Sequence, residues 1–512
     1  MKSIFKYTCL GLMAGAMLVT SCSTEQIETS PTQSMSGQGL LANANAALVT
    51  LNGIYREMYT AGWSTTANTH QCFGITAYTL CADVMGEDHV MGAQGSGWFW
   101  FDALYNVKSR FTQSSWRSYD LWYAYYNWIA NANYIIAAKE TMSGTPSEVN
   151  YVIGQAYAIR AYSYFMLSQY FARTLVGHES DPCVPLYIKP TTPETKGQPR
   201  STNAQVYAQI DEDINEAITL LEGTDRKDKS HMDYSVAQAI KARICLVENK
   251  WNEAVTAANA AIAASGCSIQ PVASFAGTNN VSASNVMWGA GIIADQVGMY
   301  ASFFAHMDLE GGKSYAVSAP KRINKQLYAK MNATDERTAW WDPSNKYQQE
   351  KFHFSDASTW MGDYIFMRVE EMYLTAAEAE CRQGHDDAAK EYLYALMSKR
   401  DASYSTNKTG ATLGKTSAPA DETGSLLEEI LIQRRIELWG EFGRMYDLKR
   451  LRQGFVRTQD QGWPEAALLT GKPTDDPEAY MNVLTIPQAE FDGNENMDAD
   501  KDQNPTGDYP KN

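Results

Sequence analysis

Four charged side chains near the C-terminus have the types and the spacing that acid–base chemistry uses. They are Arg434, Glu437, Glu441 and Arg444. They follow one another at steps of three and four residues, at which side chains meet on one face of a helix. A carboxylate beside an arginine can have a shifted pKa, so a catalytic site is one interpretation. The other is a structural network, because charges beside an apolar surface are costly unless they pair with one another. We favour the structural interpretation.

The segment that must position these residues runs from Leu426 to Leu451 and contains no proline. Its apolar residues recur at helical spacing and form one stripe. These residues are Leu427, Leu431, Leu438, Phe442 and Met445. The pattern predicts a helix in which the charged residues form a ladder beside the apolar stripe. Gly440 and Gly443 fall on the far side of this helix, where another backbone can come close, although each lowers helix propensity.

The sequence RRIELWGEFGRMYDLKR, from Arg434 to Arg450, resembles the C-terminal signature of the SusD/RagB family. One departure is that many members place the glycine directly after the second glutamate, where this chain has Phe442. Other segments resemble the family in the same order along the chain. They are ALVTLNGIY (47–55), LWYAYYNWIANAN (121–133), GQAYAIRAY (154–162), LTIPQAE (484–490) and the final Asn504-Pro505. The resemblance therefore extends from about residue 43 to the C-terminus.

This resemblance implies both a fold and a function. The implied fold is mostly α, with four tetratricopeptide-like helix pairs as a scaffold. Irregular loop and short-strand insertions would build the ligand face. The implied function is that of a non-catalytic surface lipoprotein, which captures oligosaccharide or another nutrient for a SusC-like TonB-dependent transporter. No cofactor is implied.

The N-terminus has the pattern of a lipoprotein signal. Lys2 and Lys6 precede an apolar run at 9–19, which is too short to span a bilayer. Small residues then lead to Cys22, which predicts a signal peptide at 1–21 and a lipidated Cys22. An ordinary secretory signal with a coincidental cysteine is the alternative. Acyl chains on Cys22 would anchor the protein on a membrane.

Residues 22–42 are rich in Ser, Thr, Gln and Gly and are predicted to be a flexible tether. Glu25 and Glu28 lie just after the predicted lipid site. In lipoproteins that resemble this one, acidic residues at that place mark transport to the outer face. The resemblance therefore implies a protein that is lipid-anchored in the outer membrane and faces the exterior.

The rest of the chain divides into an N-terminal region (43–265) and a C-terminal region (266–512). Helical patterns cover 43–58, 118–139, 149–171, 206–221, 235–265 and 364–397. The segments 235–265 and 364–397 each contain a short turn, with small residues where the two helices would cross, as in tetratricopeptide repeats. Such a stack buries its core only between neighbouring pairs.

Two segments rich in glycine and aromatic residues interrupt the helical patterns. Residues 62–102 are predicted to form a long loop or hairpin, and residues 266–362 to be irregular. Loops on a rigid scaffold often carry binding, and the apolar face of a sugar packs on aromatic rings. We predict that a glycan lies across four rings with two polar partners. The rings are those of Trp98, Trp100, Trp288 and Tyr300, the partners are Asn285 and Asp88, and Trp340, Trp341 and Trp360 are the next candidates.

Composition narrows the classes of function. The net charge of −16 argues against nucleic-acid binding as the main role. Six cysteines follow Cys22, with no CxxC pair and no accompanying histidine spacing, which argues against a zinc site. Disulfides are allowed in an exported protein, but the thiols can equally be buried apolar groups.

Two other classes of function remain as alternatives. An exported glycoside hydrolase needs two carboxylates that flank one glycosidic bond, and the chain has many carboxylates. A fimbria-type or adhesion lipoprotein would have the same lipid anchor on Cys22 but would take no part in nutrient transport. A glycan array combined with a hydrolysis assay would separate these functions.

Overall fold

The computed structural model describes residues 37–62, 66, 68–92, 98–106, 112–309, 314–417 and 423–506. The predicted signal peptide, the predicted lipid site Cys22 and the tether up to residue 36 lie outside the described residues. The last part of the predicted tether is helical, because Gly37–Leu41 forms helix α2. In the described ranges, no helix combines the length and the apolar character needed to cross a membrane.

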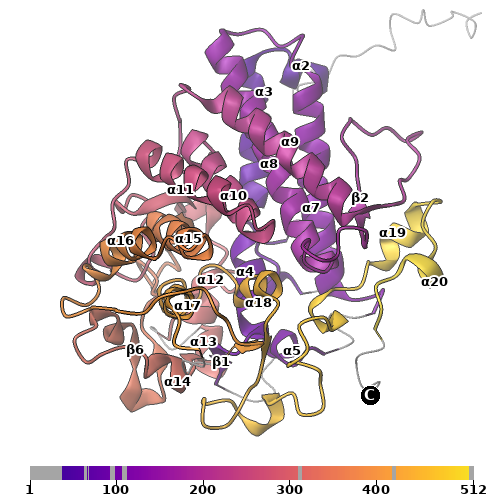
Figure 1. Cartoon of the computed structure of the whole chain (residues 1–512). Coiled ribbons are helices and arrows are strands. Elements are labelled where there is room, and N and C mark those ends of the chain that lie inside the picture. Colours follow the sequence, from indigo (N-terminus) through magenta and orange to yellow (C-terminus); the bar gives the residue numbers. More distant parts are fainter. Residues whose placement is uncertain are drawn as a thin grey trace, which may run out of the picture.

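The described part of the chain is mostly helical, as predicted (Figure 1). After α2, the α-helices are α3 (Ala44–Glu57), α4 (Ile75–Met85), α5 (Trp100–Ala103), α7 (Trp116–Ala137), α8 (Pro146–Phe171), α9 (Asn203–Leu221), α10 (Tyr234–Val247), α11 (Trp251–Ser265), α12 (Phe303–Met307), α13 (Tyr315–Ser318), α14 (Lys325–Tyr328), α15 (Val369–Arg382), α16 (Asp386–Met397), α17 (Leu426–Glu437), α18 (Arg444–Leu451), α19 (Gln488–Gly493) and α20 (Ala499–Asp502).

The long helices form a stack of antiparallel pairs. In Figure 1, α7, α8 and α9 lie side by side, followed by α10 and α11 and then by α15 and α16. Ala239 and Ala242 on α10 and Ala258 on α11 are fully buried, which confirms the prediction of small residues at that crossing. Gly154 lets α8 approach α9, because a Cβ at this position would lie 2.7 Å from Cγ of Leu221.

Local sequence explains where two of these helices begin. At the start of α8, the Thr145 hydroxyl accepts a hydrogen bond from the Glu148 N–H, and the Glu148 carboxylate accepts one from the Thr145 N–H. Thr202 and Gln205 form the same capping box at the start of α9. Each box satisfies N–H groups that the first helical turn leaves without a partner.

The predicted helix from Leu426 to Leu451 is broken into α17 and α18. Gly440 and Gly443 have φ values of 79° and 96°, a left-handed conformation that glycine adopts without steric cost. The expectation of one continuous helix is therefore wrong. The two glycines are turn residues, and α18 leaves α17 in a new direction.

Short strands form the insertions between the helices. They are β1 (His89–Met91), β2 (Pro182–Pro185), β3 (Arg200–Thr202), β4 (Val286–Ala290), β5 (Lys321–Ile323), β6 (Trp341–Asp342), β7 (Gln348–Gln349), β8 (Tyr364–Arg368), β9 (Thr416–Ser417) and β10 (Gly454–Phe455). One sheet has the order β1-β5-β7-β6, and β4 pairs antiparallel with β8. The pairs β2-β3 and β9-β10 are separate.

The segment 62–102 differs from the predicted loop or hairpin. It contains the almost entirely buried helix α4, whose residues pack into the main core. The glycines that suggested a loop lie on either side of this helix, and the helix itself is buried on nearly all faces, with Thr76 and Asp83 buried among its apolar residues. Each of the six cysteines in the described ranges is a free thiol, and five of the six are buried.

Candidate functional site

The charged ladder is a buried ion-pair network. The Glu437 carboxylate is fully buried and lies 2.8 Å from Arg400, 3.0 Å from Arg368 and 3.4 Å from Arg337. Burial raises the pKa of the Glu437 carboxyl, but the three guanidinium groups outweigh burial and hold the pKa well below its ordinary value. A carboxylate that is kept ionised and closed to solvent is poorly placed to exchange protons with a substrate, and removal of it would leave buried charges without a partner.

The expectation that the four ladder residues pair with one another is wrong. They pair with other residues instead. Glu441 pairs with Lys351 (2.5 Å) and Arg368 (2.6 Å), Arg434 with Asp447 on α18 (3.0 Å), and Arg444 with Glu87 (2.9 Å). The reason is the break between α17 and α18, which turns the second half of the ladder toward different neighbours. The network therefore joins the C-terminal helices to β8, to α15 and to the segment directly after α4.

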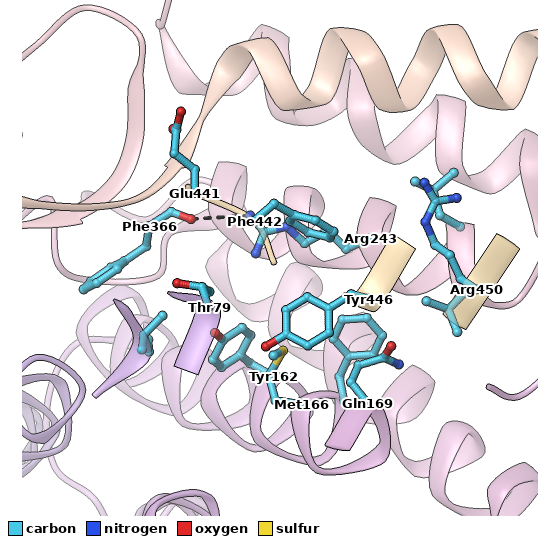
Figure 2. Close-up of a pocket in the computed structure, with 14 residues that line it drawn as sticks. Thr79, Tyr162, Met166, Gln169, Arg243, Phe366, Glu441, Phe442, Tyr446 and Arg450 are labelled. Carbon is cyan, nitrogen blue, oxygen red and sulfur yellow. Dashed lines mark hydrogen bonds between the residues drawn. The ribbon is translucent and has the colours of Figure 1, made fainter. Parts of the chain in front are cut away.

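A small internal cavity beside this network is too small to hold a sugar. The residues that line it and are labelled in Figure 2 include the aromatic Tyr162, Phe442 and Tyr446 and the basic Arg243 and Arg450. Its volume is about 20 Å³, and a water molecule alone needs about 10–15 Å³. Both guanidinium groups have carboxylate partners, so this cavity is part of the packed interior.

Four of the six predicted ligand residues lie inside the protein, where a ligand cannot reach them. The Asp88 carboxylate accepts hydrogen bonds from Arg435, and the Asn285 amide donates to Glu370 at 2.9 Å. Trp288 is fully buried in β4, and Trp100 is only 3% exposed. The structure thus gives these four residues packing and pairing roles.

The structure also distinguishes among the three next candidates, Trp340, Trp341 and Trp360. Trp340 and Trp341 are buried. Trp360 is partly exposed and lies beside Tyr300. Of all the rings that the sequence singled out, Trp98, Tyr300 and Trp360 are therefore the three that reach one surface.

These three rings join two others in a surface cluster, which we call the ring cluster. It consists of His70, Trp98, Tyr300, Tyr315 and Trp360. His70 is exposed and the other four side chains are partly exposed. The cluster brings together residues from before α4, from the segment before α5, from α13 and from the loops on either side of it.

The rings of the cluster lie next to one another in a continuous series. Trp98 stacks on Tyr315 with ring centroids 3.5 Å apart and planes 20° apart. Tyr300 lies 5.2 Å from Tyr315 and 4.7 Å from Trp360. His70 forms a hydrogen bond through Nδ1 with the Tyr315 hydroxyl. The result is a continuous aromatic surface with polar edges.

The backbone that presents Trp98 is held in an unusual conformation. Trp98 and Phe99 have φ values of 38° and 72°, which cost non-glycine residues about 1–3 kcal/mol each and gather at functional sites. The Phe99 N–H donates to the Gln71 side chain at 2.6 Å. Arg117 donates to the Gln71 carbonyl at 2.8 Å and forms a two-point ion pair with Asp102. These buried contacts compensate for the backbone strain.

The other side of the cluster shows the same kind of strain. Met299, directly before Tyr300, has a φ of 46°, and Trp360 has a φ of 62°. Trp360 lies in a tight turn in which the Asp356 carboxylate accepts hydrogen bonds from Ser358 and Thr359. The rings are therefore presented by constrained turns.

A buried histidine supports the cluster from below. His306 is fully buried, donates through Nε2 to the His70 carbonyl at 2.7 Å, and lies 5.2 Å from the Tyr315 ring. Burial holds the pKa of this imidazole well below its ordinary value, so it is neutral. The support beneath the rings is thus an uncharged aromatic layer.

The chemistry of the cluster suits stacking combined with hydrogen bonding. The indole N–H groups of Trp98 and Trp360 and the Tyr300 hydroxyl make no hydrogen bond to other described residues. No carboxylate belongs to the cluster, and no group of three His, Cys, Asp or Glu suited to a metal ion occurs in the described ranges. The arrangement favours an uncharged ligand that has both apolar faces and hydroxyl groups.

Sequence reasoning missed His70 and Tyr315. Tyr315 follows the glycine pair at 311–312 by three residues, which is the kind of neighbourhood that pointed to Trp98. His70 has no comparable signal, because its role depends on contact with rings that lie far away in the sequence.

Two family models match the chain in succession. Residues 79–246 match a model described as "Starch-binding associating with outer membrane", and residues 282–506 match a model described as "SusD family". Between them, the two matches cover most of the chain. No curated protein sequence matches it.

Solved structures share the fold over nearly the whole chain. A SusD-like carbohydrate binding protein from Bacteroides vulgatus has 25% identity and a TM-score of 0.74, with 92% of this chain and 100% of that chain covered. A SusD superfamily protein from Bacteroides thetaiotaomicron has 22% identity and a TM-score of 0.71, covering 90% and 100%. Surface glycan-binding protein A from Bacteroides thetaiotaomicron, in complex with laminarihexaose, has 16% identity and a TM-score of 0.63, covering 88% and 98%.

Proposed function

The chain belongs to the SusD/RagB family, and we propose that it is a non-catalytic surface lipoprotein that captures oligosaccharide on the ring cluster. In this proposal it passes the oligosaccharide to a SusC-like TonB-dependent transporter. Cys22 carries the lipid, and the protein is anchored in the outer membrane with its ring cluster facing the exterior.

The observation that carries this proposal is the ring cluster itself. Sugars present apolar C–H faces that pack on rings, and hydroxyl groups at their edges that need hydrogen-bond partners. Trp98, Tyr315, Tyr300 and Trp360 supply the faces. The indole N–H groups and the Tyr300 hydroxyl supply polar partners at the edges. The complex of surface glycan-binding protein A with laminarihexaose supports the choice of ligand, since that protein has the same fold.

Rigid presentation of the rings fits a capture function. Ordering a flexible side chain on binding costs about 0.5–1.5 kcal/mol. The constrained turns at Trp98 and Trp360 hold their rings in place before the ligand arrives. Most of the stacking energy is then available for affinity.

A hydrolytic function is the second candidate, and the geometry favours it less. Glycoside hydrolysis needs two carboxyl groups about 5–9.5 Å apart around the bond. None of the five residues of the ring cluster is acidic. The two carboxylates of the ladder are paired with arginines: Glu437 is buried beside Arg400, and Glu441, whose side chain is 10% exposed, lies beside Arg368.

A glycan array and a hydrolysis assay on the same purified protein test the function. We expect binding to soluble oligosaccharides without release of shorter products. Calorimetry with laminarihexaose, maltohexaose, mannohexaose and xylohexaose then locates the site. Trp98→Ala and Tyr300→Ala should each weaken binding about tenfold, while Tyr394→Ala, which removes a partly exposed ring from α16, should leave it unchanged. Unchanged binding by both Trp98→Ala and Tyr300→Ala would reject the ring cluster as the binding site. Release of shorter products would reject the non-catalytic function.

A further inference from the structure

A second concave surface lies along the outer side of α7, and we call it the tyrosine groove. Its walls include Tyr119, Trp122, Tyr123, Tyr126, Tyr187 and Glu490. Its volume is about 470 Å³, within the range of about 300–1,000 Å³ that is typical of small-ligand sites. The groove shares no residue with the ring cluster. In Figure 1, α19 and β2 lie beside α7 on this side of the molecule.

The aromatic residues of α7 do not all serve the core. Their spacing of three, four and seven residues is that of a buried helical stripe. Trp122 follows this expectation, because it is 5% exposed and its ring meets Phe171 edge-on at 4.9 Å. Tyr123 is 40% exposed, and its ring lies 5.7 Å from the Tyr119 ring with planes 18° apart. These two tyrosines therefore present nearly parallel rings outside the core.

Hydrogen bonds from three separate segments hold the groove in shape. The Tyr126 hydroxyl donates to the Pro185 carbonyl at 2.7 Å. The Tyr187 hydroxyl accepts from the Gln198 N–H at 3.0 Å. The Trp122 indole donates to Glu490 at 3.1 Å, which joins α7 to α19. The groove is thus formed before any ligand binds, which lowers the cost of binding.

The lining combines rings with groups that can bond to hydroxyls. Besides the aromatic residues, Glu490, Asn127 and Thr191 line the groove. A carboxylate oxygen has more than one acceptor position, so Glu490 can accept from a ligand hydroxyl while it holds Trp122. Two of these residues also hold protein partners, because Asn127 donates to Glu57 at 2.6 Å and Glu490 accepts from Asn494 at 2.7 Å.

The size of the groove argues for a small ligand over a protein partner. Stable protein interfaces bury about 800 Å² on each partner, whereas this surface is a hollow of about 470 Å³. We propose that the tyrosine groove is a second binding site for a short oligosaccharide, which stacks on Tyr119 and Tyr123 and is oriented by Glu490. This inference rests on the proposed function, because it gives a glycan-capturing protein a second contact on the same ligand class.

Two sites on one chain would strengthen the capture of long glycans. Once one site holds part of a long glycan, the rest of that glycan is present at a high effective concentration at the second site, provided that the glycan can span the two sites. Short oligosaccharides would occupy the two sites independently. The stoichiometry of short-ligand binding therefore reports the second site directly.

Calorimetry with laminarihexaose, maltohexaose, mannohexaose and xylohexaose on four forms of the full-length protein tests the inference. The forms are wild type, Trp98→Ala/Tyr300→Ala, Tyr119→Ala/Tyr123→Ala and the combination of all four changes. For the hexasaccharide that binds, we expect two sites in the wild type, one in each double variant and none in the quadruple variant. Tyr119→Phe/Tyr123→Phe keeps both rings and should retain two sites, and Tyr394→Ala is the control for loss of an exposed tyrosine elsewhere.

The outcomes separate the two proposals. If Tyr119→Ala/Tyr123→Ala binds with wild-type stoichiometry and affinity, the groove is not a glycan site, and the ring cluster keeps its proposed function. If Trp98→Ala/Tyr300→Ala retains every wild-type site, the ring cluster is rejected as a glycan-binding site. Loss of binding in the quadruple variant would then place glycan capture in the tyrosine groove. A wild-type protein that binds none of the four sugars overturns both proposals. Thermal unfolding of each variant checks that the fold is intact.

Discussion

The indole of Trp98 lies against the ring of Tyr315, with centroids 3.5 Å apart and planes 20° apart. The two residues come from different insertions and meet only in the folded protein. Neither ring is fully exposed, so each limits the orientations that the other can take. This pair is the centre of the ring cluster.

A double-mutant cycle should show that Trp98 and Tyr315 act together. We expect Trp98→Ala and Tyr315→Ala each to weaken oligosaccharide binding, and the double variant to lose less than the sum of the two, with a coupling of about 0.5–1.5 kcal/mol. Calorimetry on the four proteins measures this coupling. Strictly additive losses would mean that the two rings contact the ligand independently.

Gln71 should act as a positioning residue for Trp98. Gln71→Ala removes the acceptor of the Phe99 N–H, so the strained turn loses its support and the ring is presented in more than one orientation. We expect affinity to fall several-fold, with a larger entropic cost of binding. Gln71→Glu keeps an acceptor beside Arg117 and serves as the control. Equal affinity in Gln71→Ala and wild type would assign the turn geometry to other contacts.

Glu437 should contribute far more to stability than a surface ion pair does. Glu437→Ala leaves three arginines without a shared partner, and removing one member of a buried pair costs about 3–5 kcal/mol. The matched control is Glu216→Ala, which breaks the surface pair with Lys139 and should cost about 0–1 kcal/mol. Urea unfolding gives both values. A Glu437→Ala protein of normal stability that loses ligand binding would contradict the structural role.

His231 should make stability depend on pH below neutrality. Burial lowers the pKa of this imidazole to about 4, and the ring donates to Asn52 through Nε2 and accepts from the Tyr151 hydroxyl through Nδ1. The unfolded chain takes up the proton near pH 6.5. Between these pKa values the unfolded state binds more protons, so stability is complete above about pH 6.5 and falls as the pH drops toward about 4. Urea midpoints across this range should show a steeper slope for wild type than for His231→Gln, and equal slopes would exclude the imidazole as the cause.

Cys22 should carry the membrane anchor. Cys22→Ala removes the thiol that would be acylated, so the mature protein should leave the membrane fraction or the precursor should stay uncut. Labelling of cells with a palmitate analogue, followed by fractionation, measures this. Cys267→Ala changes a thiol within the folded part of the chain and is the control. Normal lipid labelling of Cys22→Ala would show that the anchor lies elsewhere.

Local patterns in the sequence determined the helical elements and the family. Apolar spacing located the long helices to within a few residues, because a helix face that must be buried leaves a period of 3.6 residues in the sequence. The capping residues Thr145 and Thr202 mark helix starts for the same local reason. The C-terminal charged ladder was recognisable as structural because an apolar stripe lies beside it.

Only the tertiary structure decided the ion-pair partners and the exposed rings. Glu437 pairs with arginines from three distant segments, and no local spacing encodes such partners. Trp98 and Trp288 have similar sequence surroundings, each beside glycine, yet Trp288 lies in a strand covered on both faces while Trp98 lies at a constrained turn. Whether a ring is buried depends on which remote segments pack over it, and that packing is a property of the whole chain.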